Sequence, residues 1–209
     1  MIAALFADYC KAQIYIEPVV GYQIDLNSTK RFQQINTAVQ CSFKQSKGYE
    51  FILQLQKSWS LQFVSNDSSF TPNPALPVYA NAKKTIRPLA SLLALGNRIT
   101  VAGKNSNNIF SVVLYTGLMS QKIAVSYQYD KNNYTILNPD KTQLRVGIFI
   151  SGGIEYMRLI KTDRVFFQLN VATPPYGKKI NYPSSFGFMA PLSFNAGYSI
   201  LIKKNNDEK

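Results

Sequence analysis

Hydrophobic and polar residues alternate along most of this chain with a period of two. Successive side chains of a strand point to opposite faces, so this alternation predicts strands that have one apolar and one polar face. The pattern is longest in 186–202, where one parity stays apolar for nine positions, and in 14–26, where it does so for seven. Soluble strands average about five or six residues, so these are long. Similar alternation predicts further strands at 34–44, 49–63, 109–119, 123–129, 144–156 and 165–171.

Turn-forming residues separate these segments and indicate an up-and-down order of strands. Two stretches rich in Ser, Asn and Pro, 65–80 and 173–185, are expected to be long loops. The segment 86–101 is ambiguous, because 89–95 is equally compatible with a buried strand and with a helical turn. Short turns are expected at 46–48, 105–108, 120–122 and 161–164. The chain is therefore predicted to be all-β, with eight to ten strands.

The polar face of these strands carries amides, hydroxyls and glycines more often than charges, and only 16% of the residues are charged. A face open to bulk water is usually more charged, whereas a narrow lumen suits small polar groups. No run approaches the roughly 18 to 20 apolar residues of a membrane-spanning helix. Unpaired backbone groups in hydrocarbon cost several kcal/mol, so a sheet in lipid must close on itself. We therefore expect a closed antiparallel up-and-down transmembrane β-barrel. Aromatic residues near its strand ends are candidates for interfacial girdles or ordinary strand residues: Tyr22, Tyr49, Trp59, Tyr156 and Tyr198.

The first residues resemble the tail of a secretory signal peptide, with a short apolar stretch and a small residue before Gln13. This divides the chain into a signal-peptide remnant (1–12), a β-barrel (13–203) and a polar tail (204–209). Export to a bacterial outer membrane follows as an expectation. Without Cys10, Cys41 is the single remaining cysteine, so no disulfide framework is expected.

The composition argues against enzymatic chemistry. The chain has no histidine, which excludes Ser–His–Asp and Cys–His nucleophiles and His-ligated metals. Neither phosphate-binding pattern, GxxxxGK[ST] or GxGxxG, is present. We predict no catalytic, metal-binding or cofactor-binding residue, and no cofactor.

The formal net charge of +12 has two interpretations. The lysine pairs 83–84, 178–179 and 203–204 flank strands and fit solvated loop ends. Alternatively, they attract acidic lipid headgroups or lipopolysaccharide. Nucleic-acid binding is not expected, because the charges are spread along the chain. The expected partners are outer-membrane lipid and other envelope proteins.

Five charged residues fall on the polar, lumen-facing parity: Glu17, Asp25, Glu50, Arg145 and Glu155. An isolated buried charge is costly, so in a narrow barrel these residues are expected to pair across the lumen and plug it. A selective pore lined by them, or a carboxylate pair acting as general acid and base, are the alternatives.

Several stretches together resemble the small outer-membrane β-barrel proteins of the Bacteroidota, the OmpA-like or porin-family barrels. They are Ala12–Gln13 at the presumed cleavage site, 147–159 (GIFISGGIEYMRL), 161–169 (KTDRVFFQL) and 192–202 (LSFNAGYSILI). Such barrels usually end in an aromatic residue, whereas here the last strand ends at Ile202 and the chain continues to Lys209.

The resemblance implies a non-enzymatic envelope barrel. Its role would be an anchor, a surface-binding protein acting through 65–80 and 173–185, or a component of a secretion or conjugation complex. A secreted soluble β-barrel or sandwich that binds a hydrophobic ligand is the main alternative. A passive pore is less favoured, because the interior of so small a barrel is mostly filled by side chains.

Overall fold

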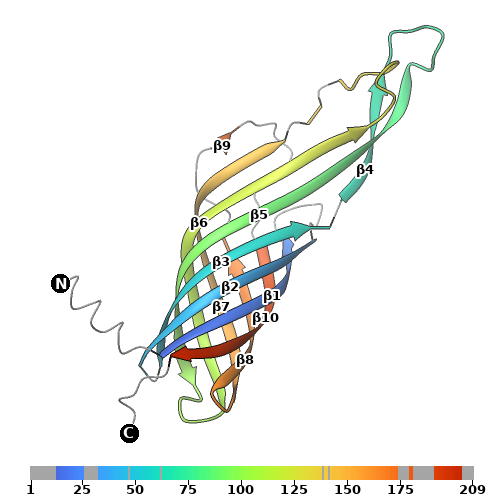
Figure 1. Ribbon diagram of the computed structural model, residues 1–209. Helices are drawn as coiled ribbons and strands as arrows, with labels where there is room; N and C mark the ends of the chain where they lie inside the picture. The colour runs from blue at the N-terminus through green and yellow to red at the C-terminus, as the bar shows by residue number, and fades with distance from the viewer. Residues whose placement is uncertain are drawn as a thin grey trace.

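The computed structural model describes residues 13–25, 33–46, 48–61, 63–137, 139–140, 142–173, 179–180 and 191–203 (Figure 1). The expected signal-peptide remnant, the polar tail, Phe188 and most of 173–185 lie outside these residues. No helix in the described part is long and apolar enough to cross a membrane. The strands are β1 (Gln13–Asp25), β2 (Gln33–Ser46), β3 (Tyr49–Ser60), β4 (Phe63–Phe70), β5 (Tyr79–Ala102), β6 (Asn108–Gln128), β7 (Gln143–Ile160), β8 (Asp163–Ala172), β9 (Lys179–Ile180) and β10 (Pro191–Lys203).

These strands form one antiparallel sheet that closes on itself. The hydrogen-bonded order is β3-β2-β1-β10-β8-β7-β6-β5, and β3 also pairs with β5, which completes the ring. The ring thus contains eight of the described strands. β4 continues on β5 beyond the end of β3, and the two-residue β9 pairs with β7. The predicted closed, up-and-down antiparallel barrel is confirmed.

The strand register fixes the dimensions of the barrel. A path across paired residues that starts at Ile14 returns to the same strand at Ile24, a shear of ten residues, through Phe43, Phe51, Asn97, Leu114, Gly152, Val171 and Leu192. For eight strands, this shear gives a tilt of about 40° and a radius of about 8 Å. Such an interior is just wide enough for side chains to fill.

The two faces of the sheet are inverted relative to a soluble protein. On the outside, Ile148 and Phe194 have 56% and 49% of their surface exposed, and Leu53 is also exposed. On the inside, Gln54 is 6% exposed and Asn195 7%. The apolar parity therefore faces outwards around the whole ring, and the polar parity fills the lumen.

The two ends of the barrel differ. Residues 13 and 203 lie at one end, together with the short connections 46–49, 102–108 and 160–163 (Figure 1). The longer connections, between β4 and β5, β6 and β7, and β8 and β10, lie at the other end. In outer-membrane barrels the short turns are periplasmic and the long loops are extracellular.

A ribbon of β4, β5 and β6 extends beyond the ring at the long-loop end (Figure 1). β5 has 24 residues; β3 covers its 89–99 portion, and β4 covers 79–86. Phe63 and Ile123 pack on the fully buried Ile86, and Phe70 forms a bridge with Thr135. We call this ribbon the extension: residues 63–70, 79–88 and 123–128.

Three local predictions were wrong or incomplete in this region. Residues 65–70 and 79–80 are strand rather than loop, because they pair with each other in the β4–β5 ladder, which supplies their backbone hydrogen bonds. The ambiguous segment 86–101 is strand throughout. The expected turn at 120–122 lies inside the continuous β6, where Lys122 is simply an exposed, outward-facing residue.

Candidate functional site

A buried guanidinium occupies the lumen near the end with the termini. Arg98 lies on β5, four residues before that strand ends, and its side chain is 1% exposed. Its inward direction follows from strand alternation, since the neighbouring Asn97 and Ile99 face outwards. Burying a charge this completely is tolerable only when opposite charges surround it.

Three carboxylates from three other strands surround Arg98. Its Nη1 donates to Glu17 Oε1 at 3.1 Å and to Glu50 Oε2 at 2.6 Å. Its Nη2 donates to Glu17 Oε2 at 3.0 Å and to Glu155 Oε2 at 3.0 Å. Nε lies 2.7 Å from Glu155 Oε1. One arginine thus ties β1, β3, β5 and β7 together across the lumen.

A second arginine extends the network towards the termini. Arg164 of β8 donates from Nη1 to Glu50 Oε1 at 2.5 Å. Its Cζ lies 3.5 Å from the centre of the Tyr15 ring, so the cation also stacks on an aromatic face. Glu50 is therefore shared between both arginines. We call Glu17, Glu50, Arg98, Glu155 and Arg164 the lumen network.

Neutral donors add hydrogen bonds to two of these carboxylates. The hydroxyls of Ser42 and Ser199 donate to Glu17 Oε1 at 2.9 and 2.8 Å. Gln168 donates to Glu155 and, at 3.3 Å, to the Tyr115 hydroxyl. These groups are themselves buried. These ion pairs and hydrogen bonds offset part of the cost of desolvating five charges.

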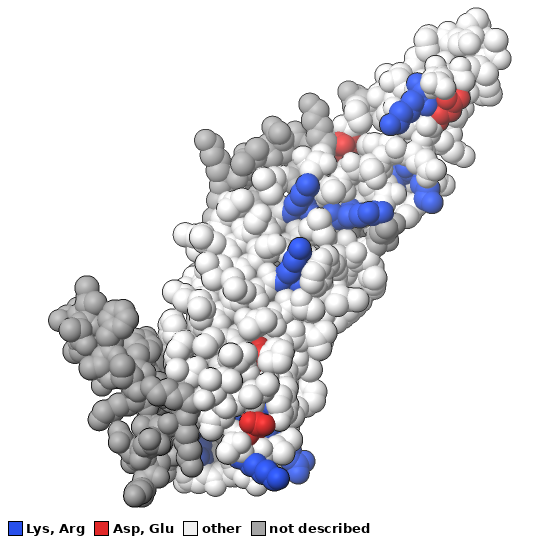
Figure 2. All heavy atoms as spheres, in the orientation of Figure 1, with Lys and Arg blue, Asp and Glu red and all other residues white. Residues whose placement is uncertain are grey.

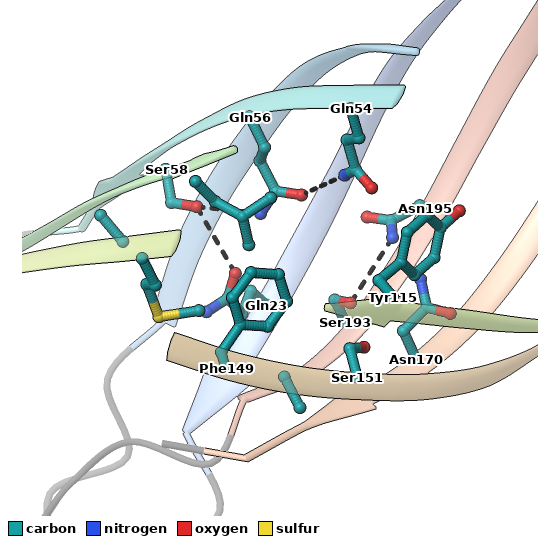
Figure 3. A pocket seen from close by; sticks show the side chains of 14 residues that line it. Gln23, Gln54, Gln56, Ser58, Tyr115, Phe149, Ser151, Asn170, Ser193 and Asn195 are labelled. Carbon is teal, nitrogen blue, oxygen red and sulfur yellow. Dashed lines mark hydrogen bonds between the residues drawn. The ribbon is translucent and has the colours of Figure 1, made fainter. Parts of the chain in front are cut away.

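Apolar side chains fill the lumen beside the network and between it and the outer half of the barrel. They make two clusters: Val19, Ala38, Met157 and Phe166, and Ile52, Ala94, Val113, Tyr115, Met119 and Phe149. The outer half holds a small cavity of about 40 Å³, lined by apolar side chains such as Phe149 and by amides and hydroxyls that include Gln23, Gln54, Ser58 and Asn195 (Figure 3). That volume has room for a few water molecules.

The structure brings together three of the five charged residues predicted to face the lumen: Glu17, Glu50 and Glu155. The side chains of Asp25 and Arg145 lie outside the described part. Their backbones lie eight residues from Glu17 on β1 and ten from Glu155 on β7, at the opposite end of the barrel.

Sequence reasoning missed both arginines of the network. Arg98 lies in the segment whose structure was ambiguous, and Arg164 lies in an expected turn. One signal was available: three inward carboxylates in a narrow lumen require cations. Alternating small residues, Ala90, Ala94 and Gly96, also mark the inward parity of β5 on which Arg98 falls.

The chemistry of this site is structural. The carboxylates contact a guanidinium rather than an open cavity, so a substrate has no access to them. In the described part of the chain, no group of three potential metal ligands could hold an ion. What the arrangement does is cross-link five strands (β1, β3, β5, β7 and β8) across the lumen.

The fold and this site define a class: a closed eight-stranded β-barrel, apolar outside and polar inside, with an ion-paired plug. No known protein family matches the chain, and no curated protein is detectably similar to it. Among solved structures, the chain is similar to the N-terminal β-barrel domain of OprF from Pseudomonas aeruginosa (10% identity, TM-score 0.42, covering 90% of this chain and 99% of that one). It is also similar to Ail, the attachment invasion locus protein of Yersinia pestis (6% identity, TM-score 0.39, covering 90% and 94%). Similarities this remote say nothing about function.

Proposed function

We propose that this protein is a non-enzymatic barrel of the bacterial outer membrane, an anchor that holds the extension and the outer loops at the cell surface. The observation that carries the proposal is the inverted sheet. Large apolar side chains are exposed around the ring, while glutamines, asparagines, serines and charges are buried inside. Water is a poor solvent for such an exterior, and hydrocarbon is a good one.

Aromatic residues at the termini end fit a membrane interface. Tyr49, Tyr156 and Tyr198 lie on the outward parity, and each hydroxyl bonds to a neighbour near the turns. The bond from Tyr156 to Asn108 Oδ1 is 2.8 Å, and that from Tyr198 to Asp163 Oδ2 is 2.6 Å. A ring in lipid with its hydroxyl at a polar edge is the usual arrangement of an aromatic girdle.

The lumen argues against the two alternatives. A passive pore needs a continuous water path, whereas Arg98 and its three carboxylates cross the barrel. A soluble carrier of a hydrophobic ligand needs an apolar interior cavity. Here the interior cavity has a volume of only about 40 Å³, far below the roughly 300 Å³ or more of a typical ligand pocket.

Two measurements test the proposal. The native protein should fractionate with the outer membrane, migrate as a heat-modifiable band and give no steady channels in planar bilayers. Replacing both lumen arginines, Arg98→Met with Arg164→Met, should raise the frequency of channel openings. Arg158→Met, which removes an exposed arginine, is the matched control and should leave the bilayers silent.

Either of two results would overturn the proposal. Recovery of the native chain as free periplasmic protein would show that the apolar exterior does not face lipid. Steady conductance by the unmodified barrel would show that the lumen network does not close it.

A further inference from the structure

A shallow groove of about 590 Å³ crosses the outer surface of β2, β3, β5 and β6. Short side chains create it: Thr37, Ser91 and Ser120 lie in one row across paired strands, together with Lys57. Their outward faces stand lower than those of the neighbouring leucines. The barrel is thus hollowed on its lipid-facing side, in the half near the long loops.

Towards the termini, an unbroken apolar row borders the groove. Val39, Leu55, Leu93 and Leu118 pair in sequence across four strands, and all four are exposed. A hydrocarbon chain lying in the groove would contact this row along its length. No charged residue interrupts it.

Towards the long loops, basic residues border the groove. Trp59, Leu89 and Lys122 pair in the next row outwards, and Arg87, two residues before Leu89, lies on the same face of β5. Lys57 reaches from inside the groove to within 5.6 Å of the centre of the Trp59 ring. In the described residues, no carboxylate forms an ion pair with Lys57 or Lys122. Figure 2 shows basic side chains over this outer part of the face, above a largely uncharged stretch.

We propose that this groove binds a phosphorylated, multiply acylated glycolipid of the outer leaflet, the lipid A portion of lipopolysaccharide. The order of chemistry along the barrel axis matches that ligand: an apolar row for acyl chains, a row of hydroxyls for their polar linkages, and cations for phosphates. The cations come from three adjacent strands spaced about 4.8 Å apart, which suits a headgroup with more than one phosphate. The inference rests on the proposed outer-membrane location.

The single tryptophan of the chain, Trp59, lines the groove and reports binding directly. The full chain in detergent micelles is titrated with lipid A, with dephosphorylated lipid A and with phosphatidylglycerol, and bound lipid is counted by native mass spectrometry. Native protein should bind lipid A saturably and more tightly than either comparison lipid. Near a membrane surface each lysine contributes about a fivefold change in affinity, so Lys57→Gln with Lys122→Gln should weaken binding roughly thirtyfold.

Two further variants separate charge from shape. Lys104→Gln removes one positive charge near the termini, far from the groove, and should bind lipid A as the native protein does. Ser120→Phe fills the groove without changing charge and should weaken binding of the acylated ligand.

The proposal is overturned if dephosphorylated lipid A or phosphatidylglycerol binds as tightly as lipid A. It is also overturned if Lys104→Gln loses as much affinity as the double variant, because the effect would then be net charge. A barrel that inserts into bilayers but fails these titrations refutes this site alone. A native chain that does not insert refutes the proposed function instead.

Discussion

Replacing Arg98 by methionine tests whether the lumen network holds the barrel together. Methionine is about as long as arginine and keeps most of the packing, but it removes the cation that three carboxylates share. Glu50 would keep Arg164 as a partner. Glu17 and Glu155 would keep only neutral hydrogen-bond donors, from Ser42, Ser199 and Gln168.

The expected magnitude follows from the cost of leaving buried charges uncompensated. Removing one partner of a buried ion pair usually destabilises a protein by about 3–5 kcal/mol. Two carboxylates lose their charged partner here, which increases the expected loss of stability. Their remaining hydrogen bonds and water in the lumen decrease it. We therefore expect Arg98→Met to lower the free energy of unfolding by about 3–5 kcal/mol.

The assay is urea unfolding of the barrel in lipid vesicles, followed by Trp59 fluorescence and by heat modifiability. Arg158→Met, on the outward face of β7, controls for loss of an arginine and should stay within about 0.5 kcal/mol of the native protein. Adding Glu17→Gln and Glu155→Gln to Arg98→Met removes the carboxylates that have lost their cation and should restore part of the lost stability. A change below about 0.5 kcal/mol in Arg98→Met would refute the reasoning, because the network would then contribute nothing measurable.

Two further predictions concern the exterior and the outer loops. Ile148→Arg puts a charge on the lipid face and should destabilise the vesicle-inserted barrel by about 2–4 kcal/mol in the same unfolding assay; an unchanged midpoint would mean that this face does not contact hydrocarbon. In the connection between β6 and β7, hydrogen bonds from the Asn133 side chain and the Asn132 backbone lower the pKa of Asp130 below its usual value. The stabilisation of this turn by ionised Asp130 should therefore be complete above about pH 3.9 and be lost as the pH falls through the depressed pKa. Asn133→Ala should raise the pKa of Asp130 in a carboxyl NMR titration. An unchanged pKa would exclude that hydrogen bond in solution.

The faces of the strands were predictable, because a period of two needs only local sequence. Leu53, Ile148 and Phe194 point out as the parity predicts, and Ser151 and Asn195 point in. The same parity placed Glu17, Glu50 and Glu155 on one side of the sheet. Closure was predictable as well, because lipid permits no open sheet edge.

Which residues meet across the lumen was not predictable. Arg98 lies 81 residues from Glu17 and 57 from Glu155 along the chain. Their meeting depends on the ten-residue shear, which is a property of the whole ring rather than of any one strand. The sequence of a single strand therefore does not determine the shear.

The length of β5 and β6 was also hidden, for a different reason. Their outer portions carry Lys83, Lys84 and Lys122, which ordinarily mark the end of a membrane strand. Outside the membrane, however, a strand needs only a hydrogen-bonded partner. Ladder partners in β4 and β6 supply this to β5, so the strand continues beyond the ring.

The extension projects a fixed distance beyond the ring. About ten residues of β5 beyond the ring, at about 3.3 Å each and with the tilt of the barrel, correspond to roughly 25 Å of height. A hydrogen-bonded ribbon has a defined direction, whereas an irregular loop of the same length does not. A partner that binds the tip of the extension, near the bridge between Phe70 and Thr135, would therefore be held at a fixed height and angle relative to the ring.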